Sequence, residues 1–307
     1  MGLRIAIFGQ AAFGREVSER LDSIGHRIVG VWAPPEGRRP DALAALAEER
    51  GWPLFRHRRL RRKGIAIPEA VAEHRALRPQ LNVLPFTTTI LPLEIAHHPP
   101  HGSICFHPSL LPAFRGGAAL SWQIIMGAQQ TGVSVFKISE HVDSGPLVVQ
   151  RGGVEIAAGD TMASLYFDKL YSMGVQAMVD AVQSIADGSA RFTLQGEEGA
   201  SSQRLIDEEV ARIDWSRPAI EIDRLIRGCD PVPGAVTRLE GRDLRLFGCA
   251  LGDEDCSAPP GTLLAIRDGS LEIATSAGVV RVKRVQVGGG GRVEAHGAGL
   301  VPGLRFR

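Results

Sequence analysis

The feature that most restricts the fold is an alternation, over the first half of the chain, of short apolar segments with segments of helical periodicity. Apolar runs of about four to eight residues fit strands buried on both faces, and such strands separated by helices are typical of parallel sheets. The chain therefore predicts the α/β class, with a Rossmann-like, mainly parallel sheet and helices on both faces. The expected strands are 3–8, 26–32, 81–84, 103–106 and 133–138, and the expected helices are 13–24, 41–50 and 161–186.

A second, smaller domain is indicated after residues 195–203, where the sequence turns polar and small and we expect a linker. Beyond one more expected helix at 219–227, short alternating runs lie between Gly, Pro and Asp turns, which is typical of a small barrel. We therefore expect an α/β domain over 1–200 and a C-terminal β-barrel domain, OB-like, over 201–307. The expected barrel strands are 243–247, 262–266, 271–274 and 279–287.

The charge and hydropathy of the chain limit its partners. The formal net charge is +1, and residues 206–307 contain 14 basic and 15 acidic side chains, so nucleic acid is a disfavoured partner. No apolar run approaches the roughly 18 residues of a membrane span, and the chain opens on a strand pattern instead of a signal peptide. We expect a cytoplasmic protein with no membrane partner. The four scattered cysteines favour reduced thiols over a zinc site or a disulfide framework.

His107 is the first candidate for chemistry, because it ends an expected strand and a Pro-bounded turn follows at once. Ligands of open α/β sheets bind beyond the carboxyl ends of strands. An imidazole at that place can stabilise a developing oxyanion or move a proton near neutral pH. A histidine of the core, or one that caps the turn, is the alternative.

Asp143 is the second candidate. It precedes the turn Ser144-Gly145-Pro146 between two apolar runs. A carboxylate that faces a histidine fixes its tautomer and raises its basicity. The alternative is an ordinary turn aspartate, whose side chain binds nearby backbone.

Several motifs in a fixed order resemble the folate-dependent formyltransferase family. They are His107-Pro108-Ser109-Leu110-Leu111-Pro112, Arg115-Gly116, Thr131-Gly132-Val133-Ser134 and Val142-Asp143-Ser144-Gly145. The resemblance is greatest to the N-terminal hydrolase domain of 10-formyltetrahydrofolate dehydrogenase, extends to methionyl-tRNA formyltransferase and spans most of the chain. It implies an enzyme whose formyl donor is 10-formyltetrahydrofolate and which uses no metal.

The resemblance also implies roles for particular residues. His107 would stabilise the oxyanion and shuttle a proton, while Asp143 would hold His107 and help to activate the nucleophile. Arg115 would shape the loop beneath His107, although a solvated surface arginine is the alternative. The folate cleft would be formed by Phe86, Ile90, Leu91, Ser139, Glu140, His141 and Val142, of which the first three are equally compatible with core packing.

Cys105 departs from the family pattern, because the transferases carry an asparagine two residues before the catalytic histidine. The change favours the hydrolase-like branch. Loss of such an amide donor costs about 2.7–4 kcal/mol of transition-state stabilisation in other enzymes. Cys105 is a weak donor, a nucleophile that takes the formyl group, or a small inert side chain.

The formyl acceptor stays open. Water would give formate and tetrahydrofolate. An amine on a small molecule, an amino sugar or methionyl-tRNA would make the enzyme a transferase, and a separate acceptor or partner protein is compatible with either. The alternative that is not an enzyme is a folate-binding module without turnover. The basic run at residues 56–63 fits an anionic folate tail, an RNA backbone or a solvated loop.

Overall fold

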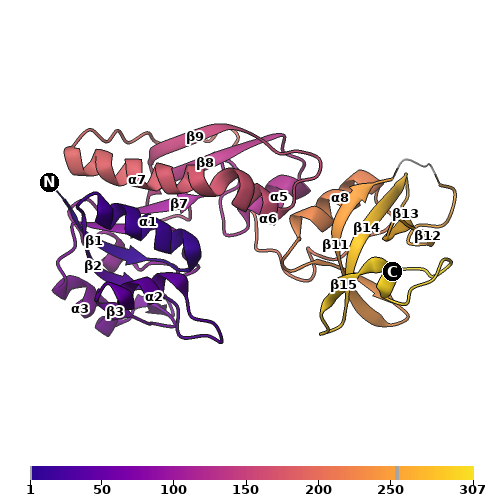
Figure 1. Cartoon of the computed structure of the whole chain (residues 1–307). Coiled ribbons are helices and arrows are strands. Elements are labelled where there is room, and N and C mark those ends of the chain that lie inside the picture. The colour runs from indigo at the N-terminus through magenta and orange to yellow at the C-terminus, as the bar shows by residue number, and fades with distance from the viewer. Residues whose placement is uncertain (1, 253–255) are drawn as a thin grey trace. The chain divides into compact units, whose positions relative to one another are not determined.

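The computed structural model describes residues 2–252 and 256–307, and its chain divides into two compact units (Figure 1). The first unit comprises Met1–Gly117, Gly132–Gly153 and Leu170–Ser202. The second comprises Ala118–Thr131, Val154–Lys169 and Gln203–Arg307. The last change of unit, after Ser202, lies close to the predicted boundary at residue 200. The units are discontinuous in sequence, so the division into 1–200 and 201–307 stays a prediction.

A seven-stranded sheet forms the framework of the first unit, in the order β3-β2-β1-β6-β7-β8-β9. Strands β3, β2, β1, β6 and β7 pair in parallel, and β8 runs antiparallel to β7. The predicted mainly parallel sheet is therefore confirmed. Its strands are β1 (Arg4–Phe8), β2 (Arg27–Trp32), β3 (Leu54–Phe55), β6 (Leu81–Leu84), β7 (Ser103–His107), β8 (Gln130–Lys137) and β9 (Leu147–Glu155).

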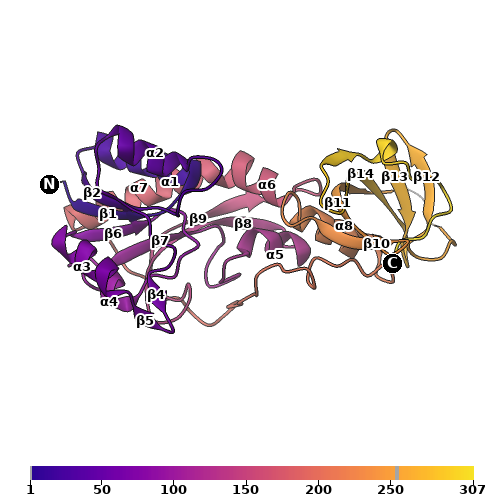
Figure 2. The ribbon, with the colours of Figure 1, turned by 90° about the horizontal axis from the view of Figure 1, so that it is seen from below.

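Helices cover this sheet on both faces, as predicted. Figure 2 shows α1 (Ala11–Ser23), α2 (Ala42–Glu49) and α7 (Tyr171–Asp187) on one face, with α3 (Pro68–Ala76) and α4 (Leu93–Ala96) on the other. The buried side chains of α1 include Phe13, Val17 and Leu21, which recur at helical spacing. The sequence patterns did not predict α3, α4, α5 (Ala119–Ile125), β3, β9 or the hairpin of β4 (Arg61–Arg62) and β5 (Ile65–Ala66).

The long helix predicted over 161–186 is interrupted. It begins as α6 (Met162–Ser164), where Thr161 and Ser164 form a reciprocal capping box. A π-helical turn, η1 (Leu165–Leu170), then precedes α7. Both leucines that bound this turn are fully buried. Because they are five residues apart, a π-helical turn places them on one side of the helix, where an α-helical turn would separate them.

The second unit contains the predicted small barrel. Helix α8 (Ala219–Gly228) precedes a sheet in the order β10-β11-β14-β13-β12, with β15 paired to β14. The C-terminal residues complete it: Arg307 exchanges two backbone hydrogen bonds of 2.8 Å with Arg238 of β10, and Leu304 accepts one from Leu263 of β12. The strands are β10 (Ala235–Leu239), β11 (Arg242–Leu251), β12 (Leu263–Arg267), β13 (Ser270–Ala274), β14 (Val279–Val287) and β15 (Arg292–Glu294).

The order of strands in the first unit determines where a ligand can bind. The chain builds outward from β1 to β2 and β3, and then returns to the other side of β1 with β6 and β7. A crevice forms at the carboxyl ends of the strands where the direction reverses, which is the usual ligand site of open α/β sheets. His107, the last residue of β7, lies at this edge.

Candidate active site

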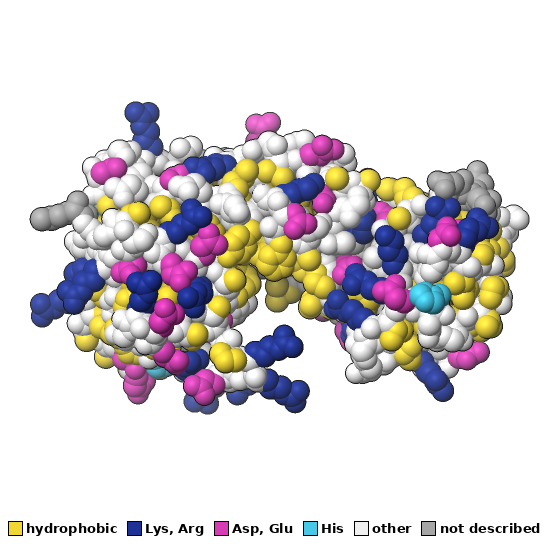
Figure 3. Space-filling view, viewed as in Figure 1, with side chains coloured by type: hydrophobic (Ala, Val, Ile, Leu, Met, Phe, Trp, Pro, Cys, Tyr) yellow, Lys and Arg dark blue, Asp and Glu magenta, His cyan; other side chains and the backbone are white. Residues whose placement is uncertain are grey.

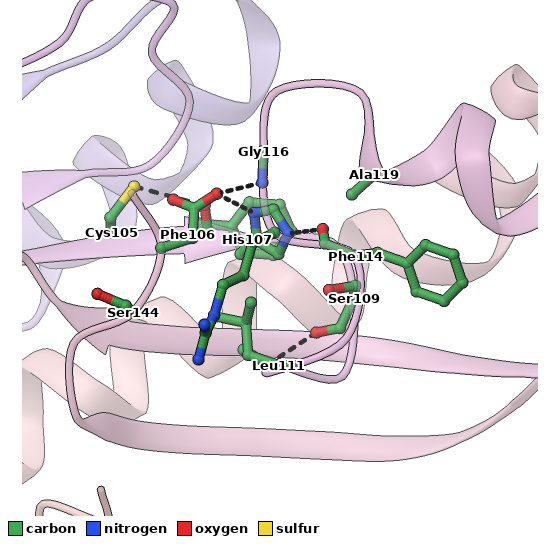
Figure 4. A network of polar contacts seen from close by, with 12 residues as sticks. Cys105, Phe106, His107, Ser109, Leu111, Phe114, Gly116, Ala119 and Ser144 are labelled. Atoms are coloured by element: carbon green, nitrogen blue, oxygen red, sulfur yellow. Dashed lines mark hydrogen bonds and ion pairs between the residues drawn. The ribbon is translucent and has the colours of Figure 1, made fainter. Parts of the chain in front are cut away.

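His107 is a buried side chain, with 5% of its surface exposed, between two oxygen atoms. Its Nε2 lies 2.8 Å from the backbone oxygen of Phe114, and its Nδ1 lies 3.5 Å from Oδ2 of Asp143. Figure 4 shows the imidazole with Phe114 on one side and Gly116 close to the other. The sequence-predicted pair of His107 and Asp143 is thus brought together from positions 36 residues apart in the chain.

The loop between β8 and β9 carries Asp143 toward the histidine. Asp143 has a left-handed backbone with φ of 52°, a conformation that aspartate tolerates better than most residues. Its Oδ2 accepts a hydrogen bond of 2.7 Å from the backbone N–H of Gly116. Gly145 allows the tight return of the loop, since a Cβ there would lie 1.8 Å from the backbone oxygen of Lys137. The position of the Asp143 carboxylate is therefore set by the backbone path of its loop and by the hydrogen bond from Gly116.

The turn after His107 is held by a network of hydroxyl and amide groups. Ser134 Oγ donates to the backbone oxygen of Ser109 at 2.7 Å and accepts from the N–H of Leu111 at 3.2 Å. Gln150 Nε2 donates to Ser134 Oγ and to the Leu111 carbonyl, at 2.9 and 2.8 Å. Ser109 Oγ donates to the Ala113 carbonyl at 2.7 Å. These bonds order the turn that presents the Phe114 carbonyl to His107.

The partners of His107 determine which ring nitrogen is available for proton transfer. A backbone carbonyl only accepts hydrogen bonds, so Nε2 carries a hydrogen and donates it to Phe114. Nδ1 is then the nitrogen that gains and loses a proton, and it faces Asp143. Burial lowers the pKa of His107, while the Asp143 carboxylate and the Phe114 carbonyl oppose that shift. The arrangement can transfer a proton between Nδ1 and a group placed beside Asp143.

Cys105 lies in β7, two residues before the histidine. Burial, and then the nearby Asp143 carboxylate, raise the pKa of its thiol well above the ordinary range. The thiol therefore stays protonated, and its Sγ lies 3.5 Å from the backbone oxygen of Phe106. A thiol that resists ionisation is a poor nucleophile. This environment favours the inert or weak-donor interpretations of Cys105 over covalent transfer of a formyl group.

The residues predicted to form the folate wall differ in exposure. Phe86 and Ile90 are 40% and 55% exposed, as expected of side chains available to a ligand, whereas Leu91 is 6% exposed and belongs to a core cluster with Phe8 and Trp32. Leu91 therefore takes the core position that the sequence left open. In the second predicted segment, Ser139 is partly buried, with its Oγ 3.0 Å from that of Ser144, and Glu140, His141 and Val142 are exposed.

The first unit contains a cleft and a groove near the predicted folate-binding segment at residues 86–91. A cleft of about 120 Å³ lies at the ends of β1 and β2, lined by residues that include Gly9, Gln10, Trp32, His57 and Thr87. A more open groove of about 300 Å³ is lined by Arg58, Arg59, Leu60, Arg61, Thr88, Thr89 and Ile90. The basic run thus borders a groove that Ile90 also lines. Across residues 2–252 and 256–307, no group of three His, Cys, Asp or Glu side chains is placed to bind a metal ion.

Gln195 and Ser201, two polar residues that the motifs did not single out, contact the loop that follows His107. Arg115 is partly buried, and its guanidinium donates from Nε and Nη2 to Gln195 Oε1, at 3.2 and 2.9 Å. Ser201 Oγ accepts a hydrogen bond of 2.8 Å from the N–H of Phe114. Both Gln195 and Ser201 come from the segment that the composition indicated as a linker, so this segment contributes two side chains to the site's framework. In sequence they carry no signal, because Gln and Ser in a polar run are typical of loops.

Comparison with known sequences gives matches along nearly the whole chain. Residues 3–182 match the family described as Formyl transferase, and residues 205–298 match its C-terminal domain. The mitochondrial 10-formyltetrahydrofolate dehydrogenase of Mus musculus is 42% identical over 266 residues, 86% of this chain. The chain spans only 28% of that relative's length. The methionyl-tRNA formyltransferase of Pseudomonas paraeruginosa is 35% identical over 296 residues, which cover 94% of this chain and 92% of the relative.

Solved structures share the fold at lower identity. The crystal structure of HypX from Aquifex aeolicus in complex with tetrahydrofolic acid superposes with a TM-score of 0.70 at 21% identity, covering 96% of this chain and 46% of HypX. An N-formyltransferase from Helicobacter canadensis, in complex with folinic acid and dTDP-3-aminofucose, has a TM-score of 0.68 at 16% identity and covers 93% and 100%. The motifs around His107 and Asp143, the family matches and the two close relatives confirm the predicted resemblance: this chain belongs to the folate-dependent formyltransferase family.

Proposed function

We propose that this enzyme removes the formyl group from 10-formyltetrahydrofolate and transfers it to water, producing formate and tetrahydrofolate. The observation that carries the proposal is the pair of the buried His107 and the partly buried Asp143, with Nδ1 and Oδ2 3.5 Å apart at the carboxyl edge of the sheet. This distance is slightly longer than an ordinary hydrogen bond. The two groups are therefore near enough for a reactant bound beside them to receive a proton from one and give a proton to the other. The exposed side chains of Phe86 and Ile90 are the proposed apolar wall for the folate ring.

The proposed reaction uses Asp143 as the base and His107 as the acid, and it restores both groups at the end. Asp143 accepts a proton from water as the water oxygen bonds to the formyl carbon, and the developing oxyanion is stabilised by the protonated imidazole. The bond between the formyl carbon and N10 of the folate then breaks, and N10 takes the Nδ1 proton of His107. The proton on Asp143 returns to Nδ1, so that the pair is restored and the products are formic acid and tetrahydrofolate. Phe114 keeps Nε2 out of this exchange.

Two observations support water as the acceptor. First, the thiol of Cys105 stands where the transferases of the resemblance have an amide, which fits the hydrolase-like branch. Second, the start of α1 follows β1 as a phosphate-binding helix would, but Asp41 Oδ2 accepts the N–H of Ala11 at 2.7 Å. The Ala11 N–H is therefore already bonded to the Asp41 carboxylate, which disfavours the binding of an acceptor's phosphate at the start of α1.

An amine acceptor such as methionyl-tRNA is the second candidate. The similarity to the Pseudomonas methionyl-tRNA formyltransferase favours it, because this relative matches over nearly its full length. The charge of the second unit does not. Its face in Figure 3 carries Lys, Arg, Asp and Glu side chains together instead of a single basic surface, and phosphate contacts require Lys and Arg in excess.

The test is to mix the protein with 10-formyltetrahydrofolate in the absence of any amine and to measure formate and tetrahydrofolate together. We expect equal amounts of both products, with a loss of about 10²-fold or more in His107→Ala, the scale of an acid–base group. A matched reaction contains methionyl-tRNA. Turnover that requires methionyl-tRNA, with no formate in its absence, would reject hydrolysis in favour of the second candidate.

A further inference from the structure

Gln195 differs from its sequence neighbours in its environment. Residues 191–194 and 196–199 are exposed, whereas Gln195 is partly buried. Its Nε2 donates two hydrogen bonds of 2.8 Å, to the backbone carbonyls of Asp143 and Gly145. Its Oε1 accepts from Arg115, as described above. One side chain therefore joins the loop that carries Asp143 to the loop that follows His107.

The chemistry of these contacts requires an amide. The carbonyl oxygens of Asp143 and Gly145 need a donor, and the guanidinium of Arg115 needs an acceptor. A glutamine satisfies all of them in one orientation only. A glutamate of the same size would still accept from Arg115 but would place an oxygen against two carbonyls. A methionine would fill the space and satisfy none of them.

Ser201 holds the other side of the site. Its Oγ accepts from the N–H of Phe114, and its backbone oxygen accepts from the N–H of Arg115 at 2.9 Å. Its own N–H donates to the Pro112 carbonyl at 3.2 Å. Phe114 has a left-handed φ of 59°, which is unfavourable for a bulky residue unless its surroundings enforce it. The three bonds of Ser201 to this loop are such a restraint.

We propose that Gln195 and Ser201 are positioning residues that set both contacts of the catalytic imidazole. Gln195 fixes the backbone of Asp143, whose carboxylate faces Nδ1 of His107. Ser201 fixes Phe114, whose carbonyl accepts from Nε2. The two side chains thus act on opposite edges of one ring, from a single segment of chain. This inference rests on the proposed acid–base role of His107 and Asp143, and it adds the residues that hold that pair at its working distance.

The kinetic test compares Gln195→Met and Gln195→Glu with Gln176→Met. Gln176 is the matched control, because it also joins an arginine, Arg20, to an acidic side chain, Asp180, in the same unit but away from His107. We expect both Gln195 variants to lose about 10- to 100-fold in kcat, the scale of a misplaced catalytic group. The KM for the folate should change little, and the control should retain wild-type kcat. A folded Gln195→Met enzyme with wild-type kcat would overturn the proposal.

Ser201 has its own conservative comparison. Ser201→Ala removes the acceptor for the Phe114 N–H, while Ser201→Thr keeps a hydroxyl at the same place. We expect kcat to fall in Ser201→Ala and to recover to near the wild-type value in Ser201→Thr. Equal losses in both variants would show that packing matters at this position and the hydroxyl does not, which contradicts the assigned role.

A measurement without turnover separates this proposal from the hydrolase assignment. The imidazole of His107 is followed by NMR in protein labelled with ¹⁵N-histidine, and its signals are identified by their loss in His107→Gln. We expect Gln195→Met to move the His107 titration in the same direction as Asp143→Asn. Asp143→Asn removes the carboxylate near Nδ1, and Gln195→Met releases the loop that holds it there. If this shift appears in an enzyme that does not hydrolyse the folate, the positioning role stands and the hydrolase assignment fails. If hydrolysis occurs and the titration is unmoved by Gln195→Met, the positioning role fails.

Discussion

The imidazole of His107 meets two oxygen atoms with different chemistry. The Phe114 carbonyl is a fixed acceptor, which determines the tautomer, whereas the Asp143 carboxylate exchanges protons. Burial lowers the pKa of His107 and the carboxylate opposes this effect, so the charge of Asp143 extends to higher pH the range in which the ring is a proton donor. An Asp143 variant without the charge therefore tests the role of His107 through its pH dependence, even where the variant is slow.

We expect Asp143→Asn to move the basic limb of the pH–rate profile to lower pH. A reaction that needs the Nδ1 proton slows as pH rises through the pKa of His107. Asp143 raises that pKa, so its neutral replacement leaves the lowering effect of burial unopposed. The measurement is single-turnover kcat/KM across about pH 5 to 9 with enzyme in excess. A limb at the wild-type position would show that His107 is not the group that titrates.

Cys105 provides a second test at the residue scale. Because burial and Asp143 raise the pKa of its thiol, we expect iodoacetamide to leave it unmodified in the folded protein near pH 8. Cys256, which is partly exposed like Cys105, is the internal comparison and should be labelled first. Mass spectrometry of the peptides measures both. Labelling of Cys105 at the rate of Cys256 would restore the nucleophile as an interpretation.

At the scale of elements, the sheet and its helices bury polar groups as well as apolar ones. His74 of α3 is fully buried, and its Nε2 lies 2.7 Å from Asn82 Oδ1 of β6. Asn82 in turn donates to Ser103 of β7 and to the Ile95 carbonyl, each at 2.9 Å. This chain of bonds connects the helix layer to the two strands that lead to the active site. Its histidine is neutral at the usual working pH, since burial lowers the pKa of His74 from 6.5 to about 4.

The buried histidine predicts a pH dependence of stability. The folded-state pKa of His74 lies below its unfolded value, so the unfolded chain binds the proton first as pH falls. Stability is therefore complete above pH 6.5 and is lost progressively down to about pH 4. We expect His74→Gln to reduce the difference between urea midpoints measured at the two ends of this window. The control is His101→Gln, whose parent histidine is partly exposed. A pH dependence that is unchanged in His74→Gln would assign the effect to other groups.

At the scale of the whole molecule, the two units are built by different means. The first is assembled from three separate stretches of the chain that all precede residue 203, whereas the second depends on the final residues of the chain. Phe306 is 1% exposed and packs beside Trp215, with ring centroids 5.8 Å apart. Trp215 Nε1 donates to Thr237 Oγ1 at 2.9 Å, and Thr237 Oγ1 donates to the Arg307 carbonyl. The last turn of chain thus joins strand β10 to the barrel core.

Removal of the Phe306 side chain tests whether the second unit depends on the last residues of the chain. We expect Phe306→Ala to destabilise the second unit by about 3–5 kcal/mol, the usual cost of removing a buried phenylalanine. Hydrogen exchange, read amide by amide, should show lost protection in β10, β12 and β14, with the amides of β1, β6 and β7 unaffected. A loss below about 1 kcal/mol would mean that the barrel is complete without the terminal segment.

Much of the fold could be predicted from the sequence, because it depends on patterns that are local. The apolar runs correspond to β1, β2, β6, β7 and β8, and the alternating runs to β11, β12, β13 and β14, whereas β10 and β15 were not predicted. The short helices α4 and α5 and the exposed strand β9 have weak periodicity, so their existence depends on packing. The position of His107 at a strand end also follows from local pattern, since the Pro-bounded turn marks where the strand stops.

The sequence by itself determined the α/β class, the barrel, the family and the two residues proposed for chemistry. The tertiary structure alone decided that Phe114 provides a carbonyl to Nε2, that Leu91 belongs to the core, and that Gln195 and Ser201 belong to the site. For the hydrogen bonds, the physical reason is that they join loops separated by up to 87 residues through backbone groups, which every residue carries alike. Side-chain pattern identifies a strand or a titratable group, but only the folded path of the chain determines which carbonyl faces which donor.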